Sequence, residues 1–243
     1  MLTVLKLTAI PTTFSALYLL YIHHKIAQRT TAETKLFNGT KSIPPSIQKP
    51  HSMPPDITND PDTMIAYERV SSHPIHIQHT HLTHAPLDTI LTRYIRATML
   101  SFSRTPQVFL LKRMIPNNKL TARTFGEGWI QKCGFDVGDT VNGFWRVAHR
   151  GVEGDDDIEN ERIELVMEAP DGYRGPVVQG IVVVGAQRVA DGKIVFVNET
   201  WMWRGQNEKK GLLESVIGRW LHVLLSGWLV GRGVDALASG VGK

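Results

Sequence analysis

Alternating apolar and polar positions fill much of the second half of the chain. Residues 193–204, KIVFVNETWMWR, alternate with the period of two that is typical of a β-strand. Asp191 and Gly192 come just before this stretch and predict a hairpin turn that leads into it. Three earlier stretches also predict strands, and together the four predict an antiparallel meander: residues 141–150, 162–169 and 177–189.

Helical spacing of apolar residues appears on both sides of this meander. Residues 86–100 repeat apolar side chains every three or four positions, and residues 107–115 form a second apolar stretch that stops at Pro116. Residues 214–237 are apolar almost all round, which predicts a long buried helix. A strand-like segment at residues 64–82 precedes the helices, so the folded domain is expected to begin at Met64.

The order of strand, two helices, meander and closing helix predicts an α+β fold in which an antiparallel curved sheet wraps around the C-terminal helix. This order resembles the helix-grip arrangement of the START-like superfamily of proteins that bind hydrophobic ligands. The closing stretch GRWLHVLLSGWLVGRGV, residues 218–234, is also similar to the C-terminal helix of uncharacterised fungal domain families. The resemblance implies a cavity between the sheet and the long helix.

The N-terminus has a different pattern. Residues 2–22 are apolar apart from Lys6 and scattered hydroxyl side chains, and a helix of this length would span roughly 31 Å, close to the thickness of a bilayer core. Residues 1–29 are therefore expected to form a single-pass membrane anchor, with the positive flank favouring a cytosolic domain. A mitochondrial presequence or membrane anchor and a cleaved secretory signal remain alternatives.

The next segment, residues 30–63, is predicted to be a disordered linker. It shows no periodicity, and prolines recur along it at positions 44, 45, 50, 54, 55 and 61. X-Pro pairs favour extended chain over regular helix. The expected organisation is thus an anchor at 1–29, a linker at 30–63 and a helix-grip-like domain at 64–243.

Composition narrows the classes of partner and cofactor. The 243 residues are 42% hydrophobic and carry a net charge of +4, with no basic cluster or motif typical of nucleic-acid binding, so no nucleic-acid partner is expected. A single cysteine, Cys133, excludes an intrachain disulfide and a cysteine-based zinc site. Histidines recur from His73 to His84, and His79 and His81 have a spacing that suits one metal, but no third ligand is evident. No nucleotide-binding or metalloprotease motif occurs, so neither a cofactor nor a resident metal is predicted.

Glu199 is the first candidate for a functional group. Alternation places it on the same strand face as Val195, Val197, Trp201 and Trp203, which is otherwise apolar. A carboxylate in such surroundings either pairs with a cation or becomes an acid–base group in a cavity. An arginine partner would indicate a structural role, and a roomy apolar pocket would indicate a site.

His149 is the second candidate, because alternation places it with Trp145 and Val147 on one face of a neighbouring strand. If that face lines the cavity, His149 and Glu199 would form a general acid–base pair. The expected ligand contacts are Trp145, Trp201 and Trp203 from the sheet and Arg219 and His222 from the closing helix.

The sequence thus predicts a protein that binds a hydrophobic small molecule, such as a lipid, isoprenoid or polyketide, in a cavity beside a membrane. The alternative is a cofactor-free isomerase, cyclase or hydrolase of a polyketide or terpenoid that uses Glu199 and His149. A third hypothesis is an interaction protein whose tryptophans belong only to the core.

Overall fold

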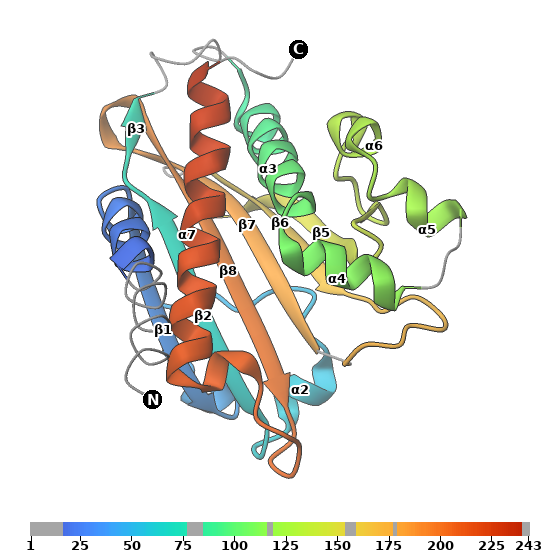
Figure 1. The fold of residues 1–243 in the computed structure, drawn as a ribbon. Helices are drawn as coiled ribbons and strands as arrows, with labels where there is room; N and C mark the ends of the chain where they lie inside the picture. Colours follow the sequence, from blue (N-terminus) through green and yellow to red (C-terminus); the bar gives the residue numbers. More distant parts are fainter. Residues whose placement is uncertain (1–16, 77–84, 116–118, 154–158, 177–178, 240–243) are drawn as a thin grey trace, which may run out of the picture.

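The computed structural model describes residues 17–76, 85–115, 119–153, 159–176 and 179–239. Its centre is an antiparallel sheet of eight strands with the order β1-β2-β8-β7-β6-β5-β4, and β3 adds to β8 beyond the end of β2 (Figure 1). The expected α+β fold with a curved antiparallel sheet and a long C-terminal helix is confirmed. The strands are β1 Thr30–Asn38, β2 Met64–Ser72, β3 Ile75–His76, β4 Thr140–Val141, β5 Trp145–Glu153, β6 Asn160–Met167, β7 Gln179–Val189 and β8 Lys193–Arg204.

Strand β8 has the bounds that its alternation predicts, and it lies between β2 and β7 inside the sheet. The turn that joins it to β7 is a short 3-10 segment, η3 Ala190–Gly192. Asp191 and Gly192 both adopt positive φ, at 61° and 66°. Asp and Gly tolerate this left-handed conformation, which explains why the pair marks the hairpin.

The helices are α2 Pro55–Asn59, α3 Leu87–Ser103, α4 Pro106–Met114, α5 Lys119–Arg123, α6 Glu127–Lys132 and α7 Val216–Ser239, with short 3-10 segments η1 Thr40–Ser42 and η4 Leu212–Glu214. Helix α7 crosses β1, β2 and β8 and packs against α3 (Figure 1). We call the side of the sheet under α3 and α7 the helix face, and the opposite side the second face.

The main core lies between the helix face and α3. Apolar residues on one stripe of α3, including Leu91, Tyr94 and Ile95, are fully buried because the helical repeat of three and four positions aims them at the sheet. Tyr94 stacks on Phe196 of β8 with ring centroids 4.3 Å apart. This contact fixes the even-numbered residues of β8, such as Phe196, on the helix face.

The odd-numbered residues of β8 therefore lie on the second face, which differs from the prediction that Trp201 and Trp203 contact a ligand between the sheet and the closing helix. Trp201 and Trp203 belong to a separate cluster with Tyr67 of β2. The chain between β1 and β2 covers this cluster with Met53 and with the partly buried side chains Ile43, Ile47 and Ile57. Alternation separates the two faces of a strand but does not show which one a helix covers.

The range 30–63 is thus not the disordered linker that the prolines suggested. Residues 30–38 form strand β1, which pairs with β2 along its whole length, from Thr30 opposite Ser72 to Asn38 opposite Met64. After β1 the chain turns back over the second face, where the buried carboxylate of Glu164 accepts hydrogen bonds from the backbone N–H groups of His51 and Ser52. Prolines interrupt regular secondary structure here without preventing side-chain packing.

Residues 17–27 form a helix that packs on α7. A Cβ at Gly227 would overlap the side chain of Ile26, and the rings of His23 and Trp220 are 6.0 Å apart. Residues 1–16, most of the predicted membrane span, lie outside the described residues. Within the described parts of the chain, no helix is long and apolar enough to cross a bilayer.

Candidate functional site

A cavity of about 330 Å³ lies between the helix face and the helices above it. The sheet contributes side chains from β5 to β8, including Trp145, Met167, Val182, Thr200 and Met202. Helices α3, α4 and α7 contribute the opposite wall, including Met99, Phe102, Leu111, Leu225 and Leu229. Most of the wall is therefore apolar.

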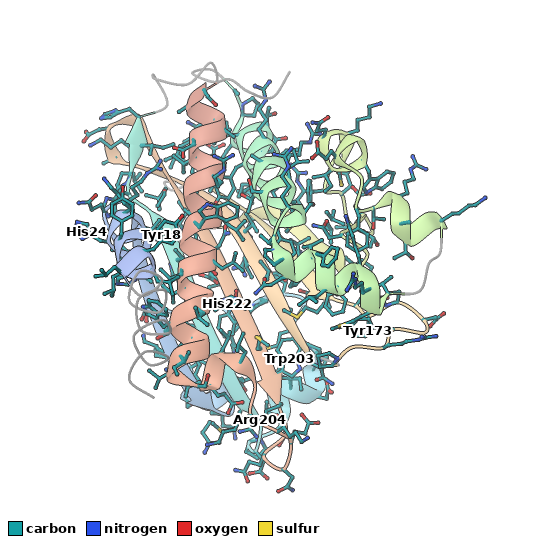
Figure 2. All side chains as sticks on the ribbon, viewed as in Figure 1. Tyr18, His24, Tyr173, Trp203, Arg204 and His222 are labelled. Atoms are coloured by element: carbon teal, nitrogen blue, oxygen red, sulfur yellow. The ribbon has the colours of Figure 1, made fainter. Side chains whose placement is uncertain are left out.

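Residues outside the strands and the α-helices complete the lining of the cavity. Leu212 and Leu213 come from η4, and Tyr173 and Pro176 come from the connection between β6 and β7. In the view of Figure 2, His222 lies on α7 and Tyr173 lies just below the right-hand end of α4. Lining residues thus come from well-separated parts of the chain.

Few polar groups interrupt the apolar wall. Besides the indole N–H of Trp145 and the hydroxyl of Tyr173, they are the side chains of Thr98, Gln107, Asn198, Thr200, His222 and Ser226. Among the described residues that line the cavity, none is Lys, Arg, Asp or Glu. A small number of polar groups in an apolar cavity is typical of sites that orient a largely hydrophobic ligand.

Glu68 of β2 organises the polar part of the wall. Its side chain is almost completely buried on the helix face, and its Oε1 lies 2.8 Å from Nδ1 of His222 and 2.7 Å from Oγ of Ser226. His222 and Ser226 are four positions apart on α7, so they project from the same side of that helix. One oxygen of the Glu68 carboxylate is thus within hydrogen-bond distance of both His222 and Ser226.

This arrangement fixes the hydrogen positions of the cluster. The Ser226 hydroxyl donates to Oε1 of Glu68, and with Glu68 ionised the carboxylate can only accept, so Nδ1 of His222 is the donor in the contact with Oε1. The neutral His222 ring then has an unprotonated Nε2. In a serine hydrolase the serine bonds the ring nitrogen that faces away from the acid, whereas Ser226 lies 3.3 Å from Nδ1. The cluster is therefore not arranged as a nucleophilic triad.

Asn198 lies on the helix face of β8 beside this cluster. Its Oδ1 accepts a hydrogen bond of 3.0 Å from the hydroxyl of Tyr94. Burial raises the pKa of Tyr94 far above its ordinary value, so this phenol stays protonated and acts as a donor. The Asn198 amide is thereby oriented with its NH2 group as the remaining donor.

Two of the predicted ligand contacts line the cavity: Trp145 and His222. The indole N–H of Trp145 is buried and has no hydrogen-bond partner among the described residues. Arg219 is half-buried on α7 and is not among the residues that line the cavity. Trp201 and Trp203 lie on the second face, so the structure separates them from the cavity.

Glu199 also lies on the second face. Its Oε1 is 2.6 Å from Nη1 of Arg69, which is directly opposite on β2, and Tyr67 and Trp201 donate to the carboxylate at 3.3 Å. Burial and the Glu199 charge raise the pKa of Tyr67. The arginine partner indicates a structural ion pair, so the prediction of Glu199 as a cavity acid differs from the structure.

His149 does not meet Glu199. A bulge between Val147 and His149 shifts the register of β5 and turns His149 to the second face, although Trp145 and Val147 stay on the helix face. There it stacks on His51 with centroids 4.5 Å apart. Strands β6 and β7 separate it from Glu199, a distance of roughly 14 Å at the usual strand spacing. The predicted acid–base pair is therefore not formed.

None of the described histidines between His73 and His84 lines the cavity. His73 lies at the end of β2 and His76 in β3, and His79, His81 and His84 lie outside the described residues. Among the described residues, no group of three or more His, Cys, Asp or Glu side chains is placed to hold a metal ion.

Sequence reasoning missed Glu68, Ser226, Asn198 and Thr200. Glu68 lies in a strand that was expected only to open the domain, and its partner is 154 residues away. The spacing of His222 and Ser226 on the closing helix was the available signal, because it placed two polar groups together on an otherwise apolar helix.

Comparison with known proteins adds no relative to this picture: no protein-family model, curated protein or solved structure matches the chain.

Proposed function

We propose that the protein binds a hydrophobic small molecule in the cavity between the sheet and α7. The observation that carries this proposal is the cavity itself: about 330 Å³ of space with an apolar wall and a few oriented polar groups. At about 30 Å³ for each water-sized group, this volume suits a ligand of on the order of ten heavy atoms.

One feature of the topology supports a proposal that follows the helix-grip resemblance. Strand β2 comes before the helices in sequence, yet it pairs with β8, the last strand, and α7 then returns across both. We therefore propose START-like ligand binding. The cavity remains the main observation behind this proposal, and the topology supports it.

We further propose that the ligand is drawn from a membrane that the N-terminal segment contacts. Leu17, Tyr18 and Leu20 on the helix over residues 17–27 have exposed fractions of 57%, 64% and 58%. On α7, Val216 and Ile217 are 78% and 72% exposed. Apolar side chains on helix surfaces favour insertion into the boundary of a bilayer.

A neutral fluorophore tests the cavity. 1-Aminoanthracene, whose emission rises in apolar surroundings, is expected to bind the full-length chain with one site. Val182→Phe places a larger side chain in the cavity wall and is expected to weaken this binding at least about tenfold, whereas Val152→Phe, at a position 70% exposed on β5, is expected to leave it unchanged. Thermal unfolding of both variants checks that they fold. Equal binding by the wild type and Val182→Phe would contradict the proposal.

Vesicles test the membrane contact separately. The full-length chain is expected to float with phosphatidylcholine vesicles, and the double variant Leu17→Glu/Leu20→Glu is expected to float less, because two charges enter an apolar surface. Val152→Glu is the control for an added charge elsewhere. Flotation that is unaffected by the double variant would exclude this surface as the contact.

A further inference from the structure

The polar groups of the cavity wall determine which head group a hydrophobic ligand can carry. We infer that its ligand carries a neutral hydroxyl head group, an alcohol, whose hydrogen is accepted by Nε2 of His222. This inference rests on the proposed function, because it names the class of molecule that the same cavity would hold.

His222 provides a hydrogen-bond acceptor for the ligand. Glu68 receives the hydrogen of His222 Nδ1, so Nε2 of the neutral ring is the nitrogen left for a ligand. Ser226 donates to the same Glu68 oxygen and thereby fixes the carboxylate. Because His222 is held from α7 and Glu68 from β2, the acceptor has a defined position in the wall.

The charges around the cavity disfavour an anionic head group. An anionic head group, such as the carboxylate of a fatty acid, needs a cation in an apolar cavity. No lysine or arginine occurs among the described lining residues, and the Glu68 carboxylate already lies beside the imidazole. A second negative charge there would meet a like charge without compensation. A hydroxyl head group avoids this cost.

Thr200 provides a second hydrogen-bond partner for the ligand hydroxyl. Thr200 lies directly opposite Glu68 in the sheet, and its side chain lines the cavity. Directly opposite residues have Cβ atoms about 5 Å apart, so the Thr200 hydroxyl lies beside the cluster. It makes no hydrogen bond to another residue in the described ranges, so it is free to donate to the oxygen of an alcohol whose hydrogen goes to His222.

Three small probes of similar size test the inference by displacing 1-aminoanthracene from the full-length chain. Octan-1-ol has a donor, 1-methoxyheptane has the same number of heavy atoms without a donor, and octanoate has a charge. We expect octan-1-ol to bind about fivefold more tightly than the ether, as one neutral hydrogen bond allows. We expect octanoate at pH 7.5 to bind at least about tenfold more weakly than octan-1-ol.

Two variants assign the difference to residues. His222→Asn retains a donor near the position of Nδ1, so Glu68 keeps its partner, but it removes Nε2. It is expected to weaken octan-1-ol binding about fivefold and to leave the ether unchanged. Thr200→Val conserves shape and removes the hydroxyl, with an expected loss of about threefold for the alcohol alone. This second variant decides the matter if His222→Asn does not fold.

The outcomes separate the two proposals. Equal affinity for the alcohol and the ether, or tighter binding of octanoate, would overturn the hydroxyl preference while the cavity remains a binding site. Failure of all three probes and of 1-aminoanthracene to bind would remove the proposed function and this inference with it.

Discussion

His222 on α7 donates a hydrogen bond of 2.8 Å from Nδ1 to Oε1 of Glu68, a residue 154 positions earlier on β2. The bond joins the last helix to a strand that precedes α3 in the chain. It also gives Oε1 a partner in a carboxylate that is only 1% exposed and costly to bury, while Oε2 is buried without a hydrogen-bond partner among the described residues. The same contact therefore stabilises the fold and orients a ring nitrogen of the cavity wall.

Replacement of Glu68 tests the structural half of this role. Glu68→Leu leaves His222 Nδ1 and the Ser226 hydroxyl without their common acceptor, so the free energy of unfolding is expected to fall by about 1–3 kcal/mol. Urea denaturation measures the change. Glu168→Leu, which removes a carboxylate from an exposed pair with Arg146, is expected to cost less than about 1 kcal/mol. Equal effects of the two variants would contradict the importance of the buried contact.

Glu199 is expected to behave as a structural residue. Glu199→Gln removes the charge that Arg69 pairs with on the second face and should lower the free energy of unfolding by about 1–2 kcal/mol. Binding of 1-aminoanthracene should not change, because Glu199 lies on the side of the sheet away from the cavity. A variant with normal stability and lost binding would show instead that Glu199 reaches the ligand.

The chain that covers the second face depends on Glu164. Glu164→Ala removes the acceptor of the His51 and Ser52 amides and the partner of Arg162, and a buried pair broken in this way typically costs about 3–5 kcal/mol. Amide hydrogen exchange at His51 and Ser52 is expected to become at least about tenfold faster. Glu159→Ala, in the exposed pair with Arg188, is the matched control. Unchanged protection would mean that apolar packing alone holds this segment.

Much of the architecture follows from periodicity. The bounds of β8 and the positions of α3, α4 and α7 agree with the alternation and the helical spacing to within a few residues, since each is a long element with a regular pattern. The Asp191-Gly192 hairpin was predictable because its positive φ angles restrict which residues fit there.

The candidate site was less predictable, because it depends on contacts between elements that are far apart in the sequence. The bulge that turns His149 away from the cavity changes the register by one residue, and strict alternation takes no account of it. Which face of β8 lies under α7 depends on the chain after β1 covering Trp201 and Trp203, a long-range contact without local periodicity. The Glu68–His222 contact joins distant residues in the same way.

Acid sensitivity at the edge of the cavity is expected from Glu214. The Arg204 guanidinium hydrogen-bonds both Glu214 oxygens at 2.7 Å and, as the main cause, lowers the pKa of that carboxyl. A lowered folded-state pKa adds stability above the ordinary glutamate value, and this contribution is lost as the pH falls through the folded-state value. The stability difference between the wild type and Glu214→Gln should therefore be largest near neutral pH and shrink below about pH 4. Urea denaturation at several pH values measures it; a difference that grows in acid would contradict the pairing.

Cys133 provides a probe of opening, because it is the chain's single cysteine and follows α6 in the core. Burial is the main cause that raises the pKa of its thiol to about 12, and its Sγ lies 3.3 Å from Oδ2 of Asp139. Since the thiolate is the nucleophile, the folded protein is expected to react with a thiol-specific disulfide reagent at pH 8 about a thousandfold more slowly than the chain in concentrated urea.

The reaction also reports on packing around α6. Arg96 of α3 donates a hydrogen bond of 2.8 Å to the carbonyl oxygen of Cys133, so it ties this segment to the main core. Arg96→Met removes the donor and is expected to speed the native-state reaction, because local opening exposes the thiol more often. Arg93→Met, on the same helix at an exposed position, is the control and is expected to leave the rate near that of the wild type. Rapid modification of the folded wild type would show that the thiol is neither buried nor shifted in pKa as the structure indicates.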